Sequence, residues 1–114
     1  MILIVDDNPG IRQTIKDVLQ NIDAQFCECS DGSRALDMYQ RHRPHWVLMD
    51  IKMPGMDGIT ATRMIKQSFP EARIVIVTNY DDLMLRKDAQ DAGAVAFVTK
   101  DDLSILKTVV GQIL

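Results

Sequence analysis

The stretch ILIVDD, residues 2–7, decides the fold that this sequence predicts. Its four apolar residues run directly into two aspartates, which is typical of a strand that is buried on both faces and ends at a polar edge of its sheet. Three later apolar runs also lead to a polar residue; these residues are Asp50, Thr78 and Lys100. If the four runs are parallel strands, three carboxylates, a hydroxyl and an ammonium converge at the edge where open α/β sheets bind their ligands. That constellation suits a metal ion and a phosphoryl group.

Short apolar runs alternate with longer amphipathic stretches along the chain. The runs predict strands at residues 2–5, 25–29, 46–49, 74–77 and 95–98. Helix start and stop signals bound the stretches between them. These signals are Pro9 for the first helix, residues 30–33 for the second, Asp57 and Pro70 for the ends of the third, and Asp81 or Asp82 and Gly93 for the fourth. A last helix is expected from Asp101 or Asp102. Its apolar stripe consists of Leu103, Leu106, Val109, Val110 and Ile113.

Five strand–helix units joined by right-handed crossovers predict an α/β fold. We expect a flavodoxin-like, doubly wound sheet of five parallel strands in the order 2-1-3-4-5, with helices on both faces. The second run is the least apolar and suits an edge strand. The switch point then lies between the first and third strands, which places Asp6 and Asp7 beside Asp50. Residues 1–114 have the size of one domain, which is either a complete protein or a piece excised from a longer one.

The composition, with 46% hydrophobic and 25% charged residues, is that of a soluble globular protein. A formal net charge of -3, with Lys and Arg scattered among acids, argues against direct nucleic-acid binding, which needs clustered cations. The sequence has neither the pattern of a signal peptide nor an apolar run that approaches the ~20 residues of a membrane span. We therefore expect a cytoplasmic protein that does not contact a membrane.

Four motifs follow one another along nearly the whole chain. They are Asp6-Asp7 after the first run, LMDIKMPGMDG at residues 48–58, Val77-Thr78, and AGA at residues 92–94 leading through Phe97 to Lys100. Together they resemble the receiver domain of two-component response regulators, a family that includes the bacterial chemotaxis regulator. Asp101 follows Lys100 where many relatives carry proline, which resembles receivers attached to LuxR-type DNA-binding domains. We expect a trans peptide bond there.

The resemblance implies that Asp50 accepts a phosphoryl group from a sensor histidine kinase. Asp6, Asp7, Asp50 itself and the backbone carbonyl of Lys52 are then the ligands of Mg²⁺ (or Mn²⁺). The residue chemistry agrees, because Mg²⁺ takes near-octahedral oxygen ligands and offsets the negative charge that repels a carboxylate from a phosphoryl group. Such a domain catalyses only its own phosphorylation and dephosphorylation, so we expect no enzyme acting on an external substrate.

Thr78 and Lys100 complete the catalytic set, since they offer a hydrogen-bond donor and a cation to the transferring group. In this family the hydroxyl matching Thr78 moves toward the phosphoryl group, and the aromatic matching Phe97 fills the vacated space. The change alters the surface of the fourth helix, fifth strand and fifth helix. We expect this surface to contact an output domain or partner protein that controls a transcriptional response, and it allows a phosphorylation-dependent homodimer.

Lys52, Asn79 and Tyr80 occupy positions that vary in the family and border the site. A bulky Tyr80 beside the cationic Lys52 shields an acyl phosphate from water, so we predict a long-lived phosphorylated state. Asn79 stands where a small residue is common, and it could crowd or hydrogen-bond the phosphoryl group.

Two other function classes share parts of this pattern. A phosphorylation-independent, receiver-like interaction module would keep the fold without using the site, but the set of polar residues at the strand ends is intact. An aspartyl phosphatase of haloacid-dehalogenase type also combines carboxylates and Mg²⁺ on a parallel sheet. Its nucleophile ends the first strand in a D-x-D arrangement, however, whereas Asp6 and Asp7 are adjacent, and the chain is short for that family.

Overall fold

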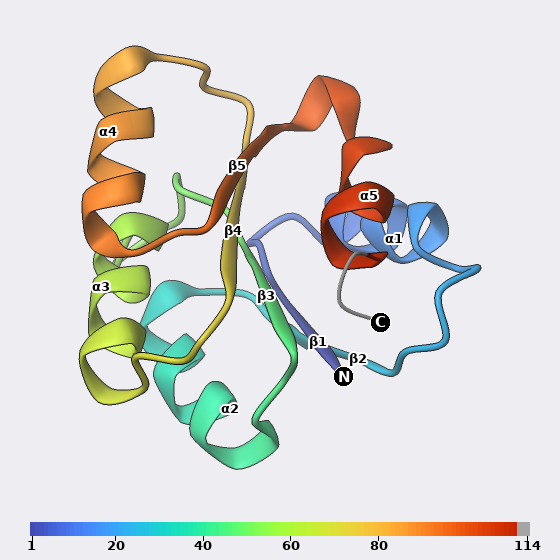
Figure 1. Cartoon of the computed structure of the whole chain (residues 1–114), viewed down its shortest axis with the longest axis horizontal. Coiled ribbons are helices and arrows are strands. Elements are labelled where there is room, and N and C mark those ends of the chain that lie inside the picture. Colours follow the sequence, from blue (N-terminus) through green and yellow to red (C-terminus); the bar gives the residue numbers. More distant parts are fainter. Residues whose placement is uncertain (112–114) are drawn as a thin grey trace.

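The predicted sheet and its strand order are both present in the computed structural model of the chain, which describes residues 1–111. Five parallel strands lie in the order β2-β1-β3-β4-β5 (Figure 1). Their bounds are Ile2–Val5 (β1), Phe26–Cys29 (β2), Trp46–Met49 (β3), Ile74–Thr78 (β4) and Ala96–Thr99 (β5). These bounds fall within one residue of the predicted ones. The weak second run forms an edge strand, as expected.

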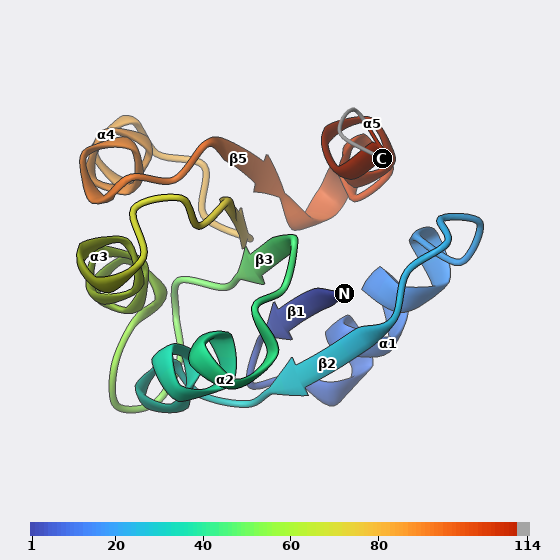
Figure 2. The ribbon, with the colours of Figure 1, turned by 60° about the horizontal axis from the view of Figure 1, so that its bottom comes forward.

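Helices cover both faces of the sheet, with α1 and α5 on one side and α2, α3 and α4 on the other (Figure 2). Their bounds are Pro9–Val18 (α1), Ala35–His42 (α2), Gly58–Ser68 (α3), Leu83–Ala92 (α4) and Ile105–Gly111 (α5), with short 3-10 helices at Gly32–Arg34 (η1) and Lys100–Asp102 (η2). The caps satisfy the first free N–H groups of these helices. Asn8 caps α1, Asp57 caps α3, and Asp82 rather than Asp81 caps α4. No helix within residues 1–111 has the length and apolar character needed to cross a membrane.

The fifth helix differs from the prediction, because it begins at Ile105 and not at Asp101 or Asp102. Lys100–Asp102 form η2 instead, and its two aspartates accept bonds from the residues that flank it: Thr99 donates to Asp101, and Ser104 Oγ donates to Asp102 Oδ1 at 2.7 Å. Short polar side chains that bond locally compete with the backbone bonds of an α-helix. The peptide bond after Lys100 is trans, as expected.

The apolar stripe of α5 is confirmed where it is described. Leu103, Leu106 and Val110 are buried and Val109 is half-buried, whereas Ile113 lies outside the described residues.

The core consists of two layers separated by the sheet, because successive side chains of a strand point to opposite faces. Leu3 and Val5 pack into the layer under α2, α3 and α4, while Ile2 and Ile4 pack into the layer under α1 and α5. All four side chains are at most 1% exposed. Burial on both faces explains why β1 is continuously apolar and why its C-terminal end meets solvent only at the edge of the sheet.

Candidate functional site

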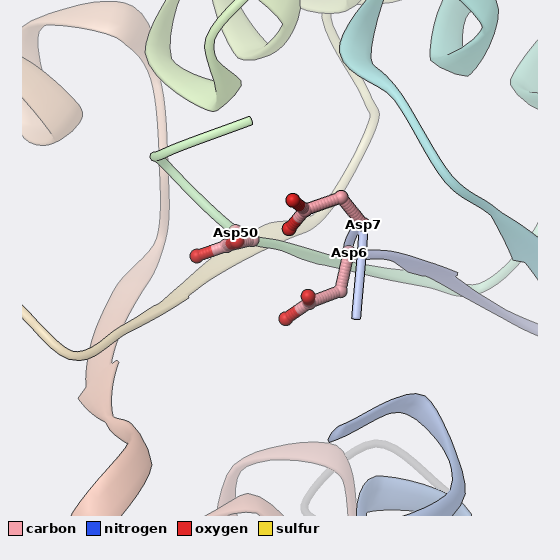
Figure 3. A group of neighbouring side chains, drawn as sticks. All are labelled: Asp6, Asp7 and Asp50. Atoms are coloured by element: carbon pink, nitrogen blue, oxygen red, sulfur yellow. The ribbon is translucent and has the colours of Figure 1, made fainter. Parts of the chain in front are cut away.

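Three carboxylates meet where β1 and β3 end (Figure 3). Val5 is paired with Met49, and the Asp50 N–H donates to the Val5 carbonyl at 2.9 Å, so the next residues of both strands are neighbours. One carboxylate oxygen from each of Asp6, Asp7 and Asp50 lies within 4.8 Å of the others. Asp6 and Asp50 are buried and Asp7 is exposed. This arrangement of oxygen atoms can hold a hard divalent cation.

Lys100 places its ammonium between the two buried carboxylates. Its Nζ lies 2.8 Å from Asp6 Oδ2 and 3.2 Å from Asp50 Oδ1, and only 8% of its side chain is exposed. Burial by itself would lower the pKa of Lys100, but the hydrogen bond to Asp6 and the charges of Asp50 and Asp6 raise the pKa above its usual value. Lys100 is therefore held as a cation beside the acidic cluster.

Asp50 is an unusually basic carboxylate. Its burial, followed by the neighbouring charge of Asp6, raises the pKa of Asp50 to about 6. Lys100 and the backbone N–H of Ile51, which donates to Asp50 Oδ1 at 2.9 Å, act in the opposite direction. At neutral pH the carboxylate is thus ionised but poorly solvated, which favours it as a nucleophile or as a ligand of a cation.

The loop after β3 folds back tightly onto Asp50. The Gly58 N–H donates to the Ile51 carbonyl at 2.9 Å, and a Cβ atom at Gly58 would lie 1.7 Å from the Asp50 carbonyl oxygen. Gly55 has a φ of 77°, a conformation that side chains rarely adopt. The loop therefore requires glycine at both positions, and the bond between Gly58 and Ile51 closes it directly after Asp50.

Thr78 ends β4 and is fully buried, and its Oγ1 accepts a hydrogen bond from the Tyr80 N–H at 3.1 Å. Tyr80 and Lys52 lie side by side, with the Lys52 Nζ 5.5 Å from the Tyr80 ring centroid. Asn79 is exposed. Phe97 is half-buried on β5, one strand away, on the face covered by α4.

Arg12 is a residue beside the site that the sequence reasoning did not single out. Its Nη1 donates to the Asp6 carbonyl at 2.6 Å, and its Nε lies 2.9 Å from Glu28 Oε1 on β2. The side chain thereby ties α1 to the end of β1. The sequence carried one signal of this contact, because Arg12 lies one turn into the helix that follows the acidic pair Asp6-Asp7.

The comparisons with known proteins agree with this geometry. The family model of the response regulator receiver domain matches residues 2–110. The chain belongs to this family. The receiver is 43% identical over 100 residues to the chemotaxis protein CheY of Bacillus subtilis, a match that spans 87% of this chain and 83% of that protein.

Solved structures extend the likeness to three dimensions. A LuxR-family response regulator from an Aurantimonas species has a TM-score of 0.87 and 34% identity to this receiver, over 98% of this chain and 82% of that one. A CheX–CheY–BeF3–Mg²⁺ complex from Borrelia burgdorferi has a TM-score of 0.88 and 29% identity, over 99% of this chain and 88% of that one. The receiver therefore shares its fold with response regulators of both the CheY and the LuxR type.

Proposed function

We propose that this receiver is a phosphoacceptor switch of a two-component system and that Asp50 takes the phosphoryl group from a sensor histidine kinase. The observation that carries the proposal is the buried Asp50 carboxylate, which has Lys100 Nζ at 3.2 Å and two further carboxylates beside it. In the transfer, an Asp50 oxygen bonds to phosphorus, the bond from phosphorus to the kinase histidine nitrogen breaks, and that nitrogen keeps the electron pair.

Asp6, Asp7, Asp50 and the backbone carbonyl of Lys52 would hold Mg²⁺ (or Mn²⁺). The donor set fits, since three carboxylate oxygens within 4.8 Å of one another match the preference of this ion for hard oxygen ligands. The bound ion would neutralise negative charge on the phosphoryl oxygens. Lys100 would pair with another of these oxygens, and the Thr78 hydroxyl would donate to the phosphoryl group, for which its proton is available because Oγ1 acts as the acceptor from Tyr80.

The output of the switch would be the surface of α4, β5 and α5. Thr78 would move toward the phosphoryl group, and Phe97 would fill the space that this movement leaves. Apolar side chains are exposed on or beside this surface; they are Leu83, Met84, Val95 and Ile105. Exposed apolar groups are typical of a contact with another protein, so we infer an output domain, a partner protein or a phosphorylation-dependent homodimer there.

The likeness to a LuxR-family regulator supports a transcriptional output. In this proposal the receiver works in the cytoplasm, and residues 1–114 form one domain, which is either a complete protein or a piece of a longer regulator. It binds no nucleic acid itself and acts on no external substrate. Lys52, Asn79 and Tyr80 would set the lifetime of the aspartyl phosphate by limiting the approach of water.

The test is intact-mass analysis after incubation with acetyl phosphate and Mg²⁺. We expect one added phosphoryl group that hydroxylamine removes, and no addition to Asp50→Asn or to a sample treated with a chelator. Asp57→Asn is the matched control, because it alters an exposed aspartate that caps α3 in the same loop. A folded protein that gains no phosphoryl group from acetyl phosphate or a histidine kinase would support the alternative, a phosphorylation-independent interaction module.

A further inference from the structure

Arg86 of α4 links two parts of the molecule that lie on either side of it. Its guanidinium carbon lies 4.6 Å from the centroid of the Phe97 ring on β5. Its Nε lies 2.7 Å from Asp81 Oδ1, in the segment between β4 and α4. The guanidinium therefore covers the aromatic ring while a carboxylate from the other side fixes its position.

Both partners of Arg86 belong to the proposed switch. Asp81 follows Thr78 by three residues, and the Tyr80 N–H between them donates to the Thr78 hydroxyl at 3.1 Å. Phe97 is the aromatic side chain that would move inward. Beside it lies a hollow of about 320 Å³ between α4 and β5, lined by residues that include Arg86, Gln90 and Val95. The half-buried ring thus borders open space, and the Arg86 guanidinium contacts its face.

We propose that Arg86 is a positioning residue that holds Phe97 in its outward position and so sets how much of the unphosphorylated receiver adopts the active arrangement. This inference rests on the proposed function. The attraction between a cation and an aromatic face acts only while the two are in contact, so an inward movement of the ring breaks it. Arg86 therefore stabilises the resting state selectively, and a contact made in only one of two states shifts their populations.

Asp81 gives this contact a connection to the phosphorylation site. A free arginine side chain samples many rotamers, and the ion pair with Asp81 removes much of that freedom. When Thr78 moves toward a phosphoryl group, the segment that carries Asp81 moves with it, and the guanidinium loses its anchor. Phosphorylation would thus weaken the hold on Phe97 in addition to opening the space for its ring.

The experiment observes the ring itself by ¹⁹F NMR. The chain has three phenylalanines, so labelling with 4-fluorophenylalanine gives three signals, and Phe97→Leu identifies the one from Phe97. Spectra are compared without ligand and with Mg²⁺ and beryllofluoride as the phosphoryl mimic. Arg86→Met removes the charge and keeps the apolar stem. Lys87→Met is the matched control, because Lys87 pairs with Asp91 at 3.3 Å on the same helix.

We expect the ratio of inward to outward Phe97 in the unliganded receiver to rise about two- to fivefold in Arg86→Met, the range for an exposed cation–π contact. The apparent affinity for beryllofluoride should rise by the same factor, since the binding-competent fraction is larger. Arg86→Lys should fall between the wild type and Arg86→Met, and Lys87→Met should match the wild type.

Three results would overturn the inference in different ways. A Phe97 signal that shifts with beryllofluoride in the wild type, but shows the same ratio and affinity in Arg86→Met, would remove the role of Arg86 and leave the switch intact. A wild-type Phe97 signal that does not respond to bound beryllofluoride would overturn the movement of Phe97, and the role of Arg86 with it. An equal effect of Lys87→Met would show that charge on α4 in general, and not contact with the ring, is responsible.

Discussion

Asp50 bears its negative charge in a place where water solvates it poorly, and this has a measurable effect on stability. Its pKa of about 6 in the folded protein exceeds the ordinary value of 3.8, so the folded state binds more protons than the unfolded state between these two values. The free energy of unfolding therefore falls as the pH rises from about 4 to about 6, and the loss is complete above that range.

Asp50→Asn should abolish this loss. In metal-free buffer at pH 7.5 we expect the variant to exceed the wild type in free energy of unfolding by about 3 kcal/mol, since the two pKa values differ by about 2.2 and each pKa unit corresponds to 1.36 kcal/mol. The difference should shrink toward zero near pH 3.5, where Asp50 is protonated in both states. Urea unfolding at a series of pH values measures it, and a difference that does not change with pH would contradict the assignment of the pKa.

A second prediction at the scale of single residues concerns Lys52 and Tyr80. The Lys52 ammonium lies 5.5 Å from the centroid of the Tyr80 ring, and in the proposed function these two side chains limit the approach of water to a phosphorylated Asp50. Lys52→Asn combined with Tyr80→Ala should speed dephosphorylation about two- to fivefold, because in the wild type an exposed cation–π contact has to open before water reaches the acyl phosphate. Loss of the phosphoryl group followed by intact mass gives the rate, and an unchanged rate would refute the shielding role.

At the scale of elements, the junction between β3 and α3 depends on one glycine. A Cβ atom at Gly58 would lie 1.7 Å from the Asp50 carbonyl oxygen, so Gly58→Ala must displace backbone and not only a side chain. We expect a loss of at least ~3 kcal/mol in the free energy of unfolding, at the upper end of overpacking effects. Loss of phosphoryl acceptance should accompany it in any fraction that folds.

Gly111→Ala is the matched control for this substitution. Within residues 1–111, a Cβ atom there would meet nothing within 4 Å apart from its chain neighbours and the backbone of its own helix, and Gly111 lies in α5. Alanine is a better helix former than glycine, so this variant should gain up to ~1 kcal/mol. Thermal unfolding of the two variants side by side tests the comparison. Similar stabilities would show that the loop after β3 yields more easily than its close packing implies.

Phe97 on β5 should separate phosphoryl acceptance from output. The ring lies on the face covered by α4, and β4 separates its strand from β3 and the acidic cluster, so Phe97→Ala removes none of the proposed catalytic groups. We expect the variant to accept a phosphoryl group from acetyl phosphate at a rate within about twofold of the wild type, while its phosphorylation-dependent response is largely lost because nothing fills the space left by Thr78. The response can be measured as binding to the output partner, or as dimerisation where the receiver dimerises. An unimpaired response would refute the role of Phe97.

At the scale of the whole molecule, the sheet separates two core layers that contribute together to one folded state. Leu3 and Ile4 are adjacent and both 0% exposed, but they pack into opposite layers. Leu3→Ala and Ile4→Ala should each lower the free energy of unfolding by ~2–5 kcal/mol with an unchanged urea m value. Val95→Ala is the control, because Val95 is 56% exposed, and should change little. A mild effect of either core substitution would mean that its layer is loosely packed.

The sequence by itself determined the architecture of this receiver. Strands buried on both faces must be continuously apolar, and residues 2–5 and 46–49 have no other arrangement that hides them from water. The alternation of such runs with amphipathic stretches predicts a doubly wound parallel sheet, and the flavodoxin-like order expected for it is the one observed. The same pattern predicts that Asp6, Asp7 and Asp50 meet at one edge, since parallel strands end on the same side. The family can also be recognised from the sequence, because each of its motifs is a contiguous stretch of the chain.

Only the tertiary structure decided the contacts made by long side chains across elements. Three features left no periodic signal in the sequence. They are the start of α5 at Ile105, the bond from Arg12 to the Asp6 carbonyl, and the position of Arg86 between Asp81 and Phe97. Periodicity reports which face of an element is buried, whereas an arginine reaches partners that the packing of whole elements brings near. The pKa of Asp50 belongs to the same class, because it depends on how completely the folded chain removes water from one carboxylate.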